Sequence, residues 1–202
     1  MIIAFDVEYK VKNESIHFDP NDLEVDIVGL LIQGEHNDII TKILGKPYRQ
    51  TKHNELIYIF SSDESVVIPK LLYYLARIVP EDIIILSHNF EYDSKYVNII
   101  EKIKEDSKNY LELRTRNIYS VVMEFYGRTI TLVDTAKFEY KPLRKTMNAV
   151  RSKRSGMLDE YLISDLLETS KMIEQYPEIY NIIEMSKWFI EQSSNMVGGD
   201  RI

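Results

Sequence analysis

Two acidic residues, Asp6 and Glu8, interrupt an otherwise apolar run at residues 2–8. A short apolar run rich in branched and aromatic residues is typical of a central β-strand. Side chains two positions apart on a strand share a face, so both carboxylates point the same way from an element that should be buried. Because a buried charge is costly unless it is paired or bound to a metal, the pair is a candidate divalent-cation site. Two strand-end acids that face water are the alternative.

A third carboxylate follows another apolar run. Residues 83–86 are expected deep in the same sheet, and a segment ending in Asp93 comes after them. Ligands of a doubly wound sheet bind at the carboxyl ends of its strands, so Asp93 could approach the first two acids. Asp93 could equally serve as the cap of the helix that we expect to begin near Tyr92 or Asp93.

A fourth carboxylate lies in a helix expected near residues 158–174. Tyr161 and Asp165 are four residues apart, which places them one turn apart on the same helical face. Four apolar residues form an adjacent stripe: Leu158, Leu162, Leu166 and Ile173. A surface Tyr–Asp pair is the alternative interpretation.

The order of the expected elements indicates an α/β fold, a mixed β-sheet flanked by α-helices. The expected strands are 2–7, 24–33, 55–60 and 83–86, with a β-hairpin in 111–134 around Tyr126-Gly127-Arg128. The expected helices are 64–79, about 92–103, from Pro142 to about 150, 158–174 and 178–192. Residues 34–53 are polar and are expected to be irregular. We expect one domain over residues 1–192 and a loose tail over 193–202.

Two of these helices have an apolar face that should pack on the sheet. In the helix at 64–79 this face consists of Val67, Leu71, Leu72, Leu75 and Ile78. In the helix at 178–192 it consists of Ile179, Ile182, Ile183, Ser186 and Phe189.

The composition is that of an ordinary globular protein. The 202 residues are 45% hydrophobic and 28% charged, which is enough chain to bury a full core. There is no cysteine, which excludes thiolate metal sites, disulfides and cysteine nucleophiles. No run reaches the roughly 18 apolar residues of a membrane helix, and the N-terminus lacks a signal-peptide pattern. We therefore expect a cytoplasmic protein (in the host cell, if the source is viral) without a membrane partner.

The charge distribution is uneven. The net charge is −7, yet residues 137–155 hold seven basic residues and one acid, so this segment is +6 and the remainder −13. A solvated helix face could produce such a segment. A local phosphate-binding groove is the other possibility, since a few contacts suffice to orient a nucleic-acid strand.

Three of these segments together resemble the DEDD superfamily of 3′→5′ exonucleases, which have an RNase H-like (ribonuclease H-like) fold. Asp6-Val7-Glu8 looks like its first motif, D-x-E, and residues 89–93 look like its second, N-x-x-[FY]-D. Residues 161–165 look like its third motif in the tyrosine subclass, Y-x-x-x-D. The histidine subclass would have histidine where this chain has Glu160, so the tyrosine subclass fits.

Within this superfamily the chain resembles the exonuclease domain of protein-primed family B DNA polymerases. The likeness rests on Ser87-His88-Asn89, on the hairpin closed by Asp134 and on the basic stretch before the third motif. Those polymerases continue into several further domains, so we expect a stand-alone relative or an excised proofreading domain that cannot polymerise. One departure is Tyr9, where the family has a threonine that helps to hold the DNA end.

The resemblance implies a two-metal site for phosphodiester hydrolysis. Asp6, Glu8 and Asp165 would bind one Mg²⁺ or Mn²⁺ ion, and Asp6 would bridge to a second ion that Asp93 reaches through water. Tyr161 would orient the attacking water through its hydroxyl. An unperturbed tyrosine titrates near pH ~10, so a role as general base is not expected.

The substrate implied by the resemblance is a single-stranded DNA 3′ end in a narrow pocket. His88 and Asn89 are candidates for contacts with terminal nucleotides, and Phe90 could stack on a base or belong to the core. Phosphate contacts are assigned to the basic segment, at Lys141, Arg144, Lys145, Lys153 and Arg154. Spacing does not choose between Lys153 and Arg154 for the family's helper lysine.

Three functions remain open at this point: a 3′→5′ exonuclease on single-stranded DNA, the same chemistry on RNA, and a non-catalytic protein that binds nucleic acid or a replication or repair partner. Retention of all four acids and Tyr161 favours an enzyme.

Overall fold

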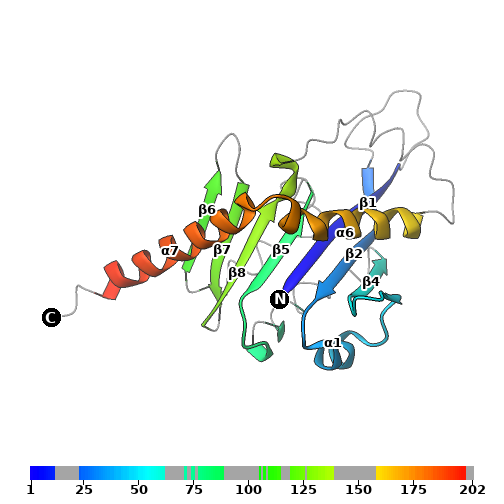
Figure 1. The fold of residues 1–202 in the computed structure, drawn as a ribbon, viewed down its shortest axis with the longest axis horizontal. Helices are drawn as coiled ribbons and strands as arrows, with labels where there is room; N and C mark the ends of the chain where they lie inside the picture. Colours follow the sequence, from blue (N-terminus) through cyan, green and yellow to red (C-terminus); the bar gives the residue numbers. More distant parts are fainter. Residues whose placement is uncertain are drawn as a thin grey trace.

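The computed structural model describes residues 1–11, 23–61, 71, 74–75, 77–88, 105, 107, 109–114, 119–125, 127–138 and 158–198. These residues form an α/β structure in which a mixed sheet of eight strands is flanked by helices (Figure 1). The expected α/β class is therefore confirmed.

The strands are β1 (Ile2–Val11), β2 (Leu23–Gln33), β3 (Arg49–Gln50), β4 (Leu56–Ser61), β5 (Ile83–Ser87), β6 (Asn109–Arg114), β7 (Tyr119–Phe125) and β8 (Arg128–Asp134). The helices are α1 (Asn37–Leu44), the 3₁₀ turn η3 (Thr135–Lys137), α6 (Leu158–Gln175) and α7 (Glu178–Gly198). The strand order is β3-β4-β2-β1-β5-β8-β7-β6. The central strands β1, β5 and β8 are parallel, and the outer strands pair antiparallel.

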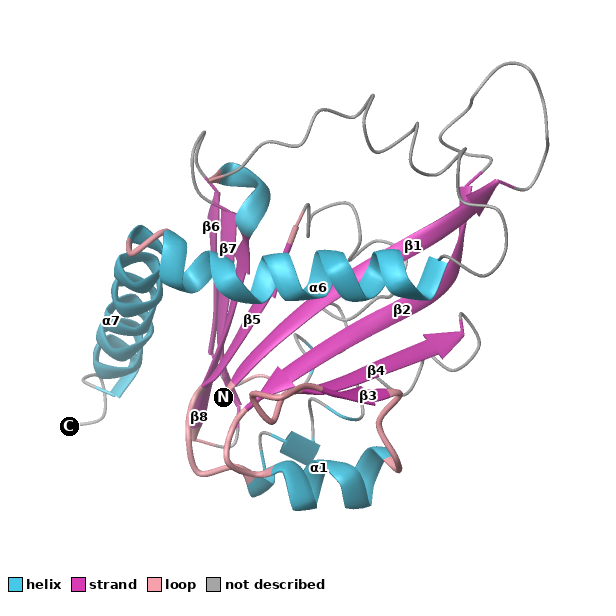
Figure 2. Ribbon diagram, turned by 45° about the vertical axis from the view of Figure 1, so that its right-hand side comes forward, coloured by secondary structure: helices cyan, strands magenta, loops and turns pink. Residues whose placement is uncertain are grey.

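The two faces of the sheet are covered by different parts of the chain. On one face, odd-numbered side chains of β1 join a core with residues of α1 and the segment that follows β4. This core includes Ile3, Phe5, Val7, Ile40, Leu71, Leu75 and Val79. On the other face, α6 crosses β5, β1 and β2, and α7 packs on β6, β7 and β8 (Figure 2). The alternation along β1 therefore decides which residues lie beneath α6.

The bounds expected for β2, β4, β5 and α6 are confirmed within one or two residues, whereas β1 continues to Val11, past its expected end at residue 7. The interval 34–53 is the clearest error, because it contains α1 and β3. The residues Ile39, Ile40, Ile43 and Leu44 have helical spacing, and Ile40 is fully buried. The helix expected near 64–79 is described only in part. Its Leu71 and Leu75 are buried as expected.

Three details of the expected faces and ends are wrong. Ile78 is exposed, and Val79 is buried in its place. Phe189 of α7 is also exposed, whereas Ile190 packs inward. The last helix continues through Gly198, past residue 192 where we expected a loose tail to begin.

The N-terminal half of the chain and α7 meet at an ion pair. Lys187 Nζ lies 2.9 Å from Asp82 Oδ2, and the Thr129 backbone N–H donates to Asp82 Oδ1 at 3.0 Å. Partial desolvation raises the pKa of Asp82, but the Thr129 N–H and the Lys187 ammonium outweigh it, so the net pKa lies below the ordinary 3.8. The charged form of Asp82 is therefore favoured in the folded state.

This ion pair should make a pH-dependent contribution to stability. A lowered folded pKa contributes stability that is present above the unfolded value and is lost as the pH falls through the folded value. We expect a double-mutant cycle of Asp82→Asn and Lys187→Met to give a coupling of at most about 1 kcal/mol at pH 7, because both groups are partly exposed. Urea unfolding should show this coupling vanish toward about pH 2. An equal coupling at both pH values would contradict the ionic interpretation.

None of the helices in the described part of the chain is both long enough and apolar enough to span a membrane.

Candidate metal centre

The two acids of β1 lie where this strand outruns its parallel neighbour. The parallel pairing of β1 with β5 ends at Phe5 and Ser87, whereas its antiparallel pairing with β2 continues to Val11. Asp6 and Glu8 are therefore inside β1, just beyond the last parallel pair, rather than at the end of the strand as expected. They still lie at the carboxyl-end edge of the parallel centre, where α/β sheets bind ligands.

The acids face α6, because β1 alternates regularly up to this point. Ala4 belongs to the apolar cluster beneath α6, and Asp6 and Glu8 continue the same even-numbered row. The helix contributes Leu162, Ile163 and Leu166 to this cluster. The apolar stripe predicted for α6 is thus the surface that brings its polar residues over β1.

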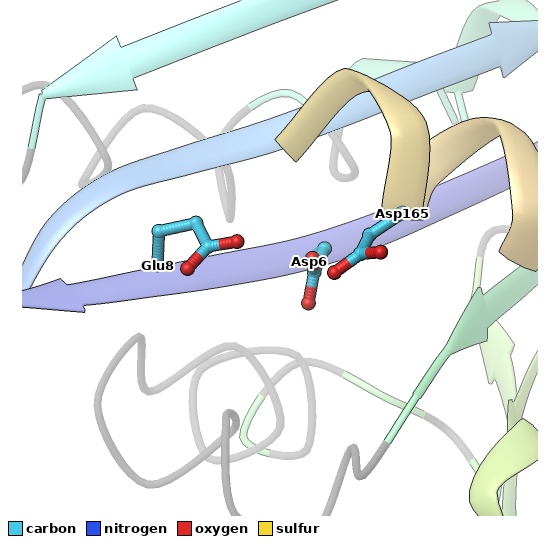
Figure 3. A group of neighbouring side chains, drawn as sticks. All are labelled: Asp6, Glu8 and Asp165. Carbon is cyan, nitrogen blue, oxygen red and sulfur yellow. The ribbon is translucent and has the colours of Figure 1, made fainter. Parts of the chain in front are cut away.

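The carboxylates of Asp6, Glu8 and Asp165 come together (Figure 3). One oxygen from each lies within 4.8 Å of the other two. Glu8 is only 5% exposed, and Asp6 and Asp165 are half-buried. Three carboxylates this close repel one another, and oxygen ligands at this spacing suit a hard divalent cation. The arrangement could hold an ion such as Mg²⁺ or Mn²⁺.

The beginning of α6 is attached to the far edge of the sheet. The Arg49 guanidinium of β3 donates to both carboxylate oxygens of Glu160, one of them at 3.3 Å. The Tyr48 hydroxyl donates to Asp159 Oδ2 at 3.1 Å. The first contact joins Glu160 to the edge strand β3. Together the two contacts hold the first turn of α6, which carries Tyr161, against the sheet.

Tyr161 is half-buried on α6, one turn before Asp165, as the spacing predicted. His88 is half-buried and directly follows Ser87, the last residue of β5. Since Ser87 pairs with Phe5, His88 is one residue past the pair that precedes Asp6. Of the three expected nucleotide contacts, His88 is therefore the one that the structure describes, and it lies next to this edge.

The remaining expected site residues lie outside the described residues. These are Asp93, Asn89, Phe90, Lys141, Arg144, Lys145, Lys153 and Arg154. The fourth carboxylate and the basic groove therefore remain predictions.

Two residues near the acids were not expected from the sequence. Lys10 follows Glu8 by two positions on β1, and its Nζ pairs with Glu24 at 3.2 Å and Asp26 at 3.7 Å. The hydrogen bond and charge of Glu24, then the charge of Asp26, raise the pKa of Lys10.

The second residue is Gly29, the β2 partner of Asp6. An isolated glycine inside an apolar strand signals close approach of another element, and this signal was available in the sequence.

Comparison with known proteins returned no match to a family model, a curated protein or a solved structure.

Proposed function

We propose that the protein is a metal-dependent 3′→5′ exonuclease that hydrolyses single-stranded DNA ends. The observation that carries this proposal is the convergence of Asp6, Glu8 and Asp165 from the first and third expected motifs. An acidic cluster alone would be a weak argument. Here, the three acids and the tyrosine one turn before Asp165 are the residues that the resemblance had assigned to one function.

The three carboxylates suit a hard divalent cation such as Mg²⁺ or Mn²⁺, and the resemblance implies a pair of such ions. Such ions, when bound, activate a water molecule and stabilise the leaving 3′ oxygen. Asp6, Glu8 and Asp165 would hold them, with Asp93 as the fourth carboxylate. The Tyr161 hydroxyl would donate a hydrogen bond to the attacking water or accept one from it. This bond would fix the direction of attack.

The finer fold assignment is part of the same proposal. The parallel centre β1-β5-β8, with β2 antiparallel to β1 and a helix over the acidic strand, is compatible with an RNase H-like fold. We propose that fold and a stand-alone relationship to a polymerase proofreading domain, with DNA ends and replication or repair proteins as partners.

The test is an incubation of purified protein with a 5′-labelled single strand in Mg²⁺, Mn²⁺ or EDTA. A descending ladder that requires the metal supports a 3′→5′ exonuclease. A 3′-labelled strand of the same sequence should release only a labelled mononucleotide. Faster cleavage of a matched RNA strand would assign the chemistry to RNA. Binding without cleavage in any metal would reject the enzyme.

Tyr161→Phe should separate the orientation of water from the binding of metal. Loss of the hydroxyl should reduce kcat by about 10- to 10²-fold, because a poorly oriented nucleophile is costly. The Mn²⁺ affinity should stay unchanged, since the carboxylates remain. Single-turnover cleavage and Mn²⁺ titration measure the two quantities.

Tyr180→Phe is the matched control, because Tyr180 is exposed on α7. Full activity of Tyr161→Phe would remove the water-orienting role from Tyr161.

A further inference from the structure

Gly29 lies next to Asp6, on the same face of the sheet. The two residues are Cα partners in the β1–β2 pairing. Leu31 and Ile27, two positions away on either side of Gly29 in β2, both belong to the apolar cluster beneath α6. Gly29 therefore faces α6 as well, and it is the position in this row without a side chain.

Space, rather than backbone conformation, accounts for the glycine. Gly29 does not have the positive φ of Gly45 and Gly127, so other residues could adopt its backbone. A Cβ placed on Gly29, however, would lie 2.7 Å from Leu166 Cδ1 and 2.9 Å from Leu162 Cγ. Both distances are well inside van der Waals contact, so α6 or its side chains would have to move.

The two leucines that rest on Gly29 also flank Asp165 in the helix. Leu166 is its immediate neighbour, and Leu162 lies one turn before it. Any lift of this part of α6 would carry Asp165 away from Asp6 and Glu8. The level of the helix above Gly29 therefore controls whether the three carboxylates can reach one ion.

We propose that Gly29 is a positioning residue: it lets α6 settle on β2 closely enough to bring the Asp165 carboxylate to those of Asp6 and Glu8. The inference rests on the proposed function for its meaning in catalysis. The geometric part concerns the distance between helix and strand, and it can be tested without metal.

The principal test is Gly29→Ala. The added methyl should lift α6 by about one ångström or less, and the protein should still fold. We expect about tenfold weaker Mn²⁺ binding, as for loss of groups that orient metal ligands, and a fall in kcat of up to about 10²-fold. Circular dichroism, Mn²⁺ titration and single-turnover cleavage provide the readouts.

Gly34→Ala is the matched control. A Cβ on Gly34 would meet only ordinary contacts, the nearest being Met1 Cε at 3.4 Å. This variant should keep both the Mn²⁺ affinity and the cleavage rate of the parent protein.

A rescue distinguishes positioning from general damage. Asp165→Glu lengthens the side chain by one methylene, so it should recover part of the lost Mn²⁺ affinity in the Gly29→Ala background. In the parent protein the same change should weaken binding. If the parent binds Mn²⁺ and Gly29→Ala binds it equally well, the proposal is overturned, because the glycine then has no positioning role. If Gly29→Ala fails to fold, the proposal is also overturned, because the glycine is then needed for folding itself.

A double-mutant cycle in EDTA tests the geometry without metal. Asp165→Asn removes one of three repelling carboxylates, so it should raise the urea midpoint of the parent. In the Gly29→Ala background Asp165 lies farther away, and this gain should shrink. Equal gains in both backgrounds would refute the positioning role. If the gains differ but the parent binds no Mn²⁺ and cuts no DNA, Gly29 still sets the helix height and the proposed function is wrong.

Discussion

Replacing Asp165 with asparagine is expected to reduce cleavage of a single strand by about 10³-fold or more. A metal ion held by these carboxylates would contribute several kcal/mol to the stabilisation of transition-state charge, and each 1.4 kcal/mol is about tenfold in rate. The fold should survive, because the amide has nearly the shape of the carboxylate and removes a charge from a repelling group. Single-turnover cleavage in Mg²⁺ and in Mn²⁺ measures the loss.

The matched control is Glu174→Gln, which changes the same kind of charge on an exposed position of the same helix. It should cleave at the parent rate. If Asp165→Asn also cleaved at the parent rate, the carboxylate triad would not be the catalytic site.

The second large effect is expected in stability rather than in rate. Under the proposed function Mn²⁺ should bind the folded triad and not the unfolded chain, so at a free concentration 100 times Kd it should stabilise the protein by about 2.7 kcal/mol. For a chain of this size this corresponds to a rise in Tm of roughly 5–10 °C. Differential scanning fluorimetry across an Mn²⁺ series, with Ca²⁺ and K⁺ series beside it, measures the rise.

Asp6→Asn and Asp165→Asn should each lose most of this stabilisation by Mn²⁺, while Glu174→Gln keeps it. A Tm that rises equally in all four proteins would mean that Mn²⁺ acts elsewhere on this acidic chain.

The faces on which the triad residues lie were predictable from local periodicity, whereas the family resemblance assigned the three acids to one site. The apolar run at 2–8 gave a strand, and the spacing of two put Asp6 and Glu8 on one face. The spacing of four put Tyr161 and Asp165 on one face of a helix with a clear apolar stripe. Each inference needed only the geometry of a single element.

What could not be predicted depends on contacts between elements. The height of α6 over β2 depends on Gly29 meeting two leucines, which no single-element pattern contains. The inward residue of α7 near its end could have been Phe189 or Ile190, since both continue a 3.6-residue period from Ser186. Packing against β6, β7 and β8 selects Ile190. The helix α1 is a different case, because the spacing of its isoleucines was visible in the sequence. We expected the segment to be irregular because most of its residues are polar.

The triad joins the first strand of the chain to a helix that begins at residue 158. Contacts of such large sequence separation form late in folding, because the entropy of closing the intervening chain must be overcome first. During synthesis, β1 leaves the ribosome long before α6 is made, so Asp6 and Glu8 are present before Asp165 can join them. The acidic triad is thus completed only after Asp165 has left the ribosome, and a fragment ending before residue 158 would contain all eight described strands but only two of the three acids.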